Sequence, residues 1–366
     1  MKRSEIRKNV TDMMIASIRQ GTPPWRKTWS LTSRPDVIVE SPNVGSPCNF
    51  HSGRCYSGIN PLLLMLASQH YGYDSRQWGT DKSWMNHLGA KVDGHATSII
   101  LFAFVPKKDK AGKVETNKAG EKITFPLMRE FPLFNAAQVK PPSVEELLDG
   151  RCGKKTVSVV KSLLKGTEAR RSKATVEELR KIAGQYAREY DVSNLTRLEI
   201  AQVIHRTVEE RIQKYLIVEI IESEPDFAPA EEFIKTTGTK IVYGPDPKYK
   251  YRGDFVQMPP KRNFDSMADY YESIFHELCH WGEVRVGRKN NDYNFGELVA
   301  EIGACFLMME IGVPMHAGMM EQRKAYVKSW LRGMESDHRF IFDASKQASK
   351  VVDFLLSLST NNVKVA

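Results

Sequence analysis

The sequence predicts an α+β fold in three parts: a mixed N-terminal module, a charged helical block and a C-terminal module of strands and helices. Three observations support it. The continuous apolar run at residues 98–105 is typical of a strand. Apolar residues repeat at helical spacing on both sides of the stretch from His276 to His280. A block rich in alternating charges separates these two patterns, as expected for an exposed helical segment.

The N-terminal module begins with an amphipathic pattern that predicts a helix over residues 6–20, stopped by Gly21 and two prolines. Asn60 and Pro61 are typical of the N-cap and first residue of a second helix. The strand at residues 98–105 is expected to return through a Lys- and Gly-rich hairpin loop into a second strand. We therefore expect helices packed against a small sheet.

Trp25 and Trp29 enclose Arg26 and Lys27, directly after two prolines. Aromatic rings stack on unpaired bases and cations neutralise phosphates, so this segment is a candidate for binding single-stranded DNA. The alternative to DNA binding is that one tryptophan fills the core. We expect Trp29 to be that residue and Trp25 to be the ring that stacks on bases. Further candidates for contact with DNA are Arg54, Tyr56, Asn60, Trp78 and Lys82.

Charge divides unevenly along the chain. Residues 1–140 hold 20 Lys and Arg against 11 Asp and Glu, a net charge of +9; residues 141–215 hold 15 against 11, net +4; residues 216–366 hold 18 against 22, net −4. A basic front half fits a module that faces nucleic acid, joined to one that does not. We therefore predict domains at residues 1–140, 141–215 and 216–366.

The middle block is predicted to form helices over residues 176–190 and 198–215, after an Arg- and Lys-rich segment. It could bind nucleic acid, bind a partner, or act as a solvated spacer. The spacer is the default interpretation, because alternating charges usually mark an exposed helix face.

The stretch His276-Glu277-Leu278-Cys279-His280 is an H-E-x-x-H motif inside a helical pattern. Residues four apart share one face of a helix, so both imidazoles can reach one zinc ion while Glu277 serves as the base that activates water. Five residues of this kind also occur by chance. The helical context favours the metal interpretation.

A catalytic zinc site needs a third protein ligand, and Glu297 and Glu301 follow on a second predicted helix at i and i+4. We assign Glu297 as the third ligand and Glu301 as the carboxylate that orients a ligating imidazole. The alternatives are that Glu297 is a capping partner of Asn294 and that Glu301 lies on a solvated face. The order of the two glutamates stays open.

Strands are expected at residues 239–243 and 254–258, before the motif helix. In such an arrangement an edge strand can hold an extended peptide beside the metal. Helices that contain Trp330 and Leu355 are expected behind the site. Tyr326 is a candidate oxyanion or proton-donor residue, although packing in the core is its commoner role.

These residues resemble a known family. The C-terminal part is similar to the zincin-like metallopeptidase domain of ArdC-type antirestriction proteins. The first 140 or so residues resemble that family's single-stranded-DNA-binding domain, which also occurs in TraC-type conjugal primases. The match is carried by Phe255-Val256-Gln257-Met258-Pro259-Pro260, the H-E-x-x-H motif, Glu297-Leu298-Val299-Ala300-Glu301, Pro24-Trp25 and Tyr56-Ser57-Gly58-Ile59-Asn60.

The resemblance implies an antirestriction protein of a plasmid or phage, which protects incoming DNA from host nucleases. Its partners would be single-stranded DNA and a protein substrate such as a host restriction component. The sequence departs from the family at Val92-Asp93-Gly94-His95-Ala96, where lysines are usual, and in the charged block. Any DNA contact carried over to that turn is therefore in doubt.

Two function classes stay open. In one, a zinc peptidase is recruited by DNA and cleaves DNA-bound proteins; in the other, the protein coats DNA and its zinc site is not proteolytic. Glu277 favours the first, since a structural zinc site needs no base. No signal peptide or membrane span is apparent, and the five cysteines lack disulfide or zinc-ribbon spacing, so we expect a cytoplasmic protein.

Overall fold

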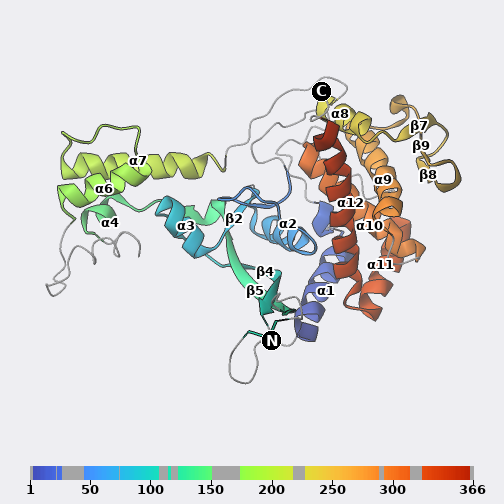
Figure 1. Cartoon of the computed structure of the whole chain (residues 1–366), viewed down its shortest axis with the longest axis horizontal. Coiled ribbons are helices and arrows are strands. Elements are labelled where there is room, and N and C mark those ends of the chain that lie inside the picture. The colour runs from blue at the N-terminus through green and yellow to red at the C-terminus, as the bar shows by residue number, and fades with distance from the viewer. Residues whose placement is uncertain are drawn as a thin grey trace.

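The computed structural model describes residues 3–21, 23–26, 45–73, 75–106, 114–116, 123–150, 174–216, 227–287, 292–313 and 324–362. It has the predicted α+β architecture (Figure 1). Helices α4, α6 and α7 form a lobe at one end of the molecule. The N-terminal sheet lies in the middle, and the bundle of α9 to α12 forms the other end. No described helix is long and apolar enough to cross a membrane.

The N-terminal module is built around a four-stranded sheet of order β1-β2-β5-β4. The long hairpin of β4 and β5 is antiparallel and in register from the pair Thr97 and Leu133 to the pair Pro106 and Thr124. Helix α2 packs against β4. The elements are α1 (Arg3–Arg19), η1 (Pro24–Arg26), β1 (Cys48–Asn49), α2 (Asn60–Tyr71), β2 (Gln77–Gly79), α3 (Asp81–Leu88), β3 (Lys91–Val92), β4 (Thr97–Pro106), β5 (Thr124–Asn135), η2 (Ala136–Gln138) and β6 (Val139–Lys140).

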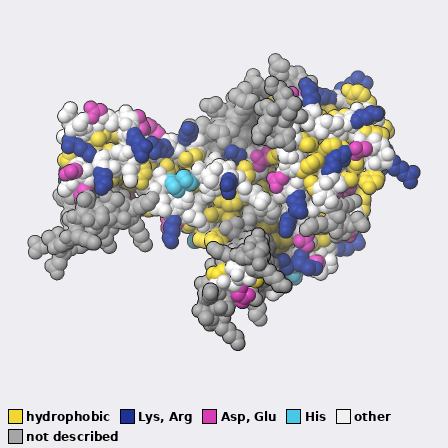
Figure 2. Space-filling view, viewed as in Figure 1, with side chains coloured by type: hydrophobic (Ala, Val, Ile, Leu, Met, Phe, Trp, Pro, Cys, Tyr) yellow, Lys and Arg dark blue, Asp and Glu magenta, His cyan; other side chains and the backbone are white. Residues whose placement is uncertain are grey.

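The charged block forms the lobe of α4 (Val144–Leu148), α6 (Val176–Tyr186) and α7 (Arg197–Gln213). Each of these helices, which are the ones described in this block, starts with a capping box, at Ser143, Thr175 and Thr196. Its apolar face does not stand alone: it shares one core with side chains of the N-terminal module, among them Phe50, Trp84 and Leu88. The lobe is therefore a packed extension of that module, and side chains of Lys, Arg, Asp and Glu are spread over its outer surface (Figure 2).

The C-terminal module combines a three-stranded sheet of order β7-β9-β8 with long helices. Strand β7 pairs parallel to β9, and β8 pairs antiparallel to it, so β8 is an edge strand. The sequence did not predict β8. The elements are α8 (Ala228–Thr236), β7 (Lys240–Tyr243), β8 (Lys248–Lys250), η3 (Tyr251–Gly253), β9 (Phe255–Met258), η4 (Lys261–Asn263), α9 (Met267–Val286), α10 (Tyr293–Ile311), α11 (Lys324–Ser336) and α12 (Phe340–Asn362).

The start of the chain packs into the C-terminal module. Helix α1 lies against α11 and η1 against α10, and Ile6, Met14 and Trp25 belong to the same apolar core as α9 and α10. Further along, the backbone N–H of Gly58 donates to Ser349 Oγ on α12 at 2.8 Å. The domain boundaries at residues 140 and 215 stay a prediction, and the apolar cores do not follow them.

One predicted cap is wrong. Asn60 is the first residue of α2, not its N-cap, which is Ile59 and makes no side-chain cap bond. Asn60 Oδ1 accepts instead from the backbone N–H of Ile100 at 2.8 Å. The buried amide therefore links α2 to the middle of β4, because a buried strand N–H needs an acceptor.

Candidate metal centre

Helix α9 carries the H-E-x-x-H motif in the interior of the C-terminal module. The Ser266 hydroxyl caps its start by accepting from the N–H of Asp269 at 3.1 Å. Tyr271, Ile274, Phe275 and Leu278 are fully buried, so this helix is fixed by packing on several sides. The turn that bears His276 and His280 faces α10 across a tight contact.

Helix α10 supplies the carboxylates. Its N-cap is Asp292, whose side chain accepts from the N–H of Asn294 at 2.8 Å. The alternative in which Asn294 caps the helix with Glu297 as its partner is therefore wrong. Glu297 and Glu301 are buried, with exposed fractions of 6% and 1%, so the solvated-face alternative for Glu301 is also wrong. The two carboxylates lie one helical turn apart and therefore share one face of α10. That face is buried.

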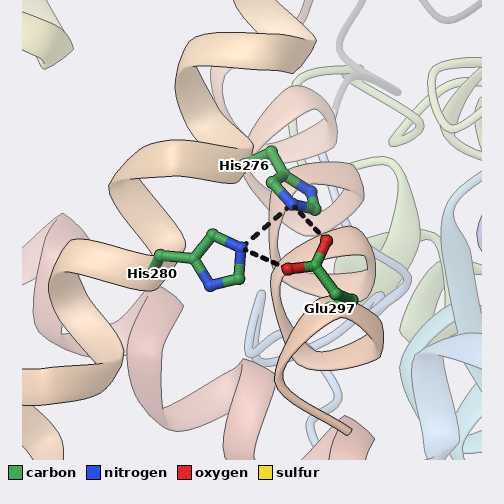
Figure 3. A group of neighbouring side chains, drawn as sticks. All are labelled: His276, His280 and Glu297. Carbon is green, nitrogen blue, oxygen red and sulfur yellow. Dashed lines mark hydrogen bonds and ion pairs between the residues drawn. The ribbon is translucent and has the colours of Figure 1, made fainter. Parts of the chain in front are cut away.

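His276, His280 and Glu297 converge on one point (Figure 3). The two Nε2 atoms are 3.1 Å apart. His280 Nε2 is 3.4 Å from Glu297 Oε1, and His276 Nε2 is 3.6 Å from Glu297 Oε2. A hydrogen bond between the two imidazoles requires one ring nitrogen to donate and the other to accept. Three potential metal-ligand atoms at this spacing are better explained by a common position for a metal ion.

These separations fit a divalent metal. Ligand atoms that sit about 2.0–2.1 Å from zinc in tetrahedral geometry lie roughly 3.3 Å from one another. Two imidazole nitrogens and one carboxylate are also the donor set of a catalytic zinc site with one open position. The residues present therefore match the group that the motif implies.

The electrostatics of Glu297 match a carboxylate held as an anion. Burial alone would raise its pKa, but hydrogen bonds to His276 and His280 and their charge outweigh burial and hold the pKa of Glu297 well below its usual value. Glu301 Oε2 lies 3.9 Å from Nδ1 of His276, on the far side of that ring. A carboxylate there can fix the tautomer that leaves Nε2 free to bind a metal.

Glu277 also faces the cavity, and its carboxylate is oriented by strand β8. Glu277 Oε2 accepts from the backbone N–H of Tyr249 at 2.6 Å. The side chain of Tyr249 donates to Asp254, which in turn binds Arg285 on α9 at 2.7 Å. Strand β8 and the residues that follow it thus contact the motif helix at two points. No sequence pattern indicated this contact, because β8 is only three residues long.

An open cavity of about 880 Å³ leads to the converging residues. Tyr326 lines it, as expected for a residue that acts there, and its hydroxyl lies 3.2 Å from that of Tyr293. Sequence reasoning missed Tyr293, although it lies one turn before Glu297 on the same helix face. The hydrogen bond between Tyr293 and Tyr326, burial and the charge of Glu297 raise the pKa of Tyr293.

The structure corrects the aromatic candidates for DNA contact. Trp25 and Trp78 are both 0% exposed, so neither can stack on a base. Trp25 packs edge-on against Trp330 with ring centroids 6.2 Å apart. Trp25 therefore fills the core, the role that the sequence predicted for Trp29. Asn60 is buried and its oxygen is occupied. Trp29 and Lys27 lie outside the described residues, as does the side chain of Arg26.

Three candidates keep access to solvent. Arg54 and Lys82 are exposed and Tyr56 is half-buried. Arg54 lies in the tight turn that follows β1, which Asn49 holds by accepting from His51 and Ser52. Burial raises the pKa of the Tyr56 hydroxyl to about 12. On the described part of the chain, the surface for DNA would therefore have to rely more on cations than on tryptophans.

Comparisons with known families agree with this geometry. Residues 4–134 match the family described as the N-terminal domain of anti-restriction factor ArdC, and residues 228–347 match a zincin-like metallopeptidase family. Crystal structures of the antirestriction protein ArdC from plasmid R388 have the same fold. The metal-free form is 25% identical with a TM-score of 0.62, and the Mn(II)-bound form is 24% identical with a TM-score of 0.59; each comparison covers 97% of this chain and 98% of the other.

Curated relatives include a DNA primase TraC of Escherichia coli, 24% identical over 97% of this chain but only 27% of the primase. The chain therefore spans about a quarter of that relative. An uncharacterized protein of Sinorhizobium fredii, y4eC, is 22% identical over 96% of this chain and 92% of its own length.

Proposed function

We propose that this chain acts as an ArdC-type antirestriction protein, which protects the incoming DNA of a mobile element by binding single-stranded DNA and hydrolysing a DNA-bound protein. The likeness to a plasmid-encoded antirestriction protein supports the antirestriction role. The proposed place of action is the cytoplasm, and the proposed protein substrate is a host restriction component.

The observation that carries the peptidase proposal is the convergence of His276, His280 and Glu297 with Glu277 on the same cavity. A site that served only to hold the fold together would be closed by four ligands. This one combines three ligand residues with a carboxylate outside the ligand set, Glu277, and an open cavity of about 880 Å³, which is the arrangement of a hydrolytic centre.

We propose zinc as the metal, held by His276, His280 and Glu297. When bound, a divalent cation supplies Lewis-acid chemistry, because it lowers the pKa of a coordinated water and polarises a carbonyl oxygen. Glu301 would keep the His276 ring in the required tautomer through Nδ1.

Glu277 is assigned the proton transfers. Its carboxylate would take a proton from the attacking water and deliver it to the amine nitrogen of the leaving group. The N–H of Tyr249 holds one of its oxygens at 2.6 Å, and we assign the proton transfer with water to the other oxygen. The orientation of this carboxylate is therefore set before substrate binds.

The hydroxyls of Tyr293 and Tyr326 are assigned to the oxygen that gains charge when the carbonyl is attacked. They lie 3.2 Å apart on the cavity wall, close enough for both to donate to one atom. Hydrogen-bond donors fixed near a developing oxyanion stabilise the transition state more than the substrate.

Single-stranded DNA binding is assigned to the N-terminal module on its family match and on the net charge of residues 1–140. Among the described residues we assign the exposed Arg54 and Lys82 as cationic contacts and the half-buried Tyr56 as a further candidate. Trp25 and Trp78 cannot stack on bases, because both rings are buried.

The test is a digest of casein and of a host extract by the full-length protein loaded with zinc, with and without single-stranded DNA. We expect the wild type to cleave protein and Glu277→Gln to cleave none. Single-stranded DNA should increase the rate at which the wild type cleaves DNA-bound proteins. If the wild type binds both zinc and DNA yet cleaves nothing, while still protecting DNA from a nuclease, the alternative of a DNA-coating protein with a non-proteolytic metal site is correct.

A further inference from the structure

Two histidines on the surface of the N-terminal module stack on each other. His51 lies in the turn after β1 and His87 in the last turn of α3, and both side chains are exposed. Their ring centroids are 3.4 Å apart and the angle between their planes is 12°. The chemistry assigned to the metal centre uses neither ring. Aromatic and imidazole rings on the surface of a module that binds single strands are candidates for stacking on unpaired bases.

The backbone around this histidine pair is held in place by short-range hydrogen bonds. The side chain of Asn49 accepts from the backbone N–H groups of His51 and Ser52 at 3.1 and 2.9 Å. Helix α3 is capped by Thr80, whose hydroxyl accepts from the N–H of Ser83 at 3.1 Å. A surface that is ordered before its ligand arrives loses less conformational freedom on binding.

A buried aromatic pair supports the two imidazoles. Phe50 and Trp84 are buried and stacked, with ring centroids 3.6 Å apart. The Phe50 ring lies 6.3 Å from the ring of His51 and 6.2 Å from that of His87. Because these two distances are nearly equal, Phe50 lies beside the histidine pair and not at either end of it. Phe50 therefore supports the pair without covering the outer face of the His51 ring.

The two segments that contribute the histidines also carry exposed cations. Arg54 follows His51 by three residues, and Lys82 lies in the first turn of α3, five residues before His87. In Figure 2, histidine side chains form a group on the surface near α3, beside Lys and Arg side chains. Cations that neutralise phosphates next to rings that stack on bases are the combination that binds single strands with little dependence on sequence.

We propose that the pair of His51 and His87 is a platform on which a base of single-stranded DNA stacks. Arg54 and Lys82 would contact phosphates of the same strand. This role rests on the proposed function, in which the N-terminal module binds single-stranded DNA. A base that extends the stack on the His51 side must be unpaired and unstacked from its neighbour, so the platform selects single strands over duplex. It supplies the stacking surface that the buried tryptophans cannot provide.

The experiment measures binding of the full-length protein to a fluorescent oligothymidine, and to the same strand paired with its complement, by anisotropy over a salt series. The pH is 8, where imidazole in solution is largely neutral. His51→Ala should weaken binding to the single strand about 5- to 10-fold at every salt concentration, because it removes a stacking contact and no phosphate contact. Affinity for the duplex should stay within about twofold of the wild type. His51→Phe, which restores a ring without the imidazole nitrogens, should recover most of the lost affinity.

Tyr71→Ala is the matched control. Tyr71 belongs to the same module, is 48% exposed and stacks on Tyr73 with ring centroids 5.5 Å apart. This variant should bind the single strand as the wild type does. If Tyr71→Ala loses the preference for single strands while His51→Ala keeps it, the bases stack at Tyr71 and the histidine platform is wrong.

The Phe variant separates stacking from the chemistry of the imidazole nitrogens. If His51→Phe loses as much affinity as His51→Ala, His51 acts through those nitrogens and the stacking role is overturned. Binding of the oligothymidine that is unchanged in His51→Ala would also overturn it, while leaving the proposed DNA-binding function standing. If the wild type itself does not bind the oligothymidine, the proposed DNA-binding function is wrong, and the platform fails with it.

Discussion

The buried residues in the contact between α9 and α10 differ in kind from those in the N-terminal module. In the first, ionisable side chains are inside: His276, Glu297 and Glu301 have exposed fractions of 2%, 6% and 1%. In the second, the described tryptophans, Trp25, Trp78 and Trp84, are inside, and the cations Arg54 and Lys82 are outside. Buried ionisable groups that converge mark chemistry, because burial without partners is costly. Buried tryptophans mark only a core.

The largest expected effect is the loss of metal from the contact between α9 and α10. His280→Ala removes one of three metal ligands, so the zinc content of the purified protein should fall from about one ion per chain to near zero. Elemental analysis after gel filtration measures it. His338→Ala is a suitable control, because that imidazole lies outside the site. Zinc retained in full by His280→Ala would remove this residue from the metal centre.

Trp25→Ala tests whether that ring belongs to the core. Removing a fully buried tryptophan that packs on Trp330 should lower the free energy of unfolding by about 3–5 kcal/mol. Urea denaturation measures it, and Trp25→Phe should cost less. Unchanged stability combined with a lost preference for single-stranded over double-stranded DNA would restore Trp25 as a stacking platform.

Glu301→Gln sharpens the division of labour between the two carboxylates of α10. The variant should still bind zinc, but with an affinity reduced about 10- to 100-fold, because the carboxylate orients His276 and does not touch the metal. Competition with a chelator gives the affinity. Glu310→Gln, at the other end of the same helix, should have no effect. Complete loss of zinc would instead exchange the assignments of Glu297 and Glu301.

The smallest expected effect concerns the cations of the N-terminal module. Lys82→Ala and Arg54→Ala should each lower the affinity for a single-stranded oligonucleotide and reduce the salt dependence of binding by about one ion. Fluorescence anisotropy across a salt series measures both. Lys8→Ala is the control, since Lys8 already pairs with Asp12 at 2.6 Å. A slope unchanged by either variant would place the DNA elsewhere.

The sequence predicted which residues form the candidate metal centre, because the geometry of this centre is local. The spacing of His276 and His280, and of Glu297 and Glu301, already places each pair on one helix face. It did not reveal that the N–H of Tyr249 binds Glu277, because a three-residue edge strand has no periodicity to read. It also assigned Trp25 wrongly as a stacking platform, since the burial of Trp25 depends on Trp330, a residue far along the chain.

The same long-range contact changes how the modules should be tested. Helix α1 and Trp25 complete the core of the C-terminal module. A fragment of residues 1–140 would therefore expose Ile6, Met14 and Trp25 to solvent and lose the partners that bury them. DNA binding is better assigned with point variants in the full-length protein than with separated halves.

The most direct test of the central claim is the zinc content and hydrolytic activity of Glu277→Gln beside the wild type. The claim is that His276, His280 and Glu297 hold the metal while Glu277 moves the proton. Both proteins should then carry about one zinc per chain, and only the wild type should cleave casein or a host protein. A Glu277→Gln protein that loses its zinc, or one that keeps it and cleaves as fast as the wild type, would contradict the account.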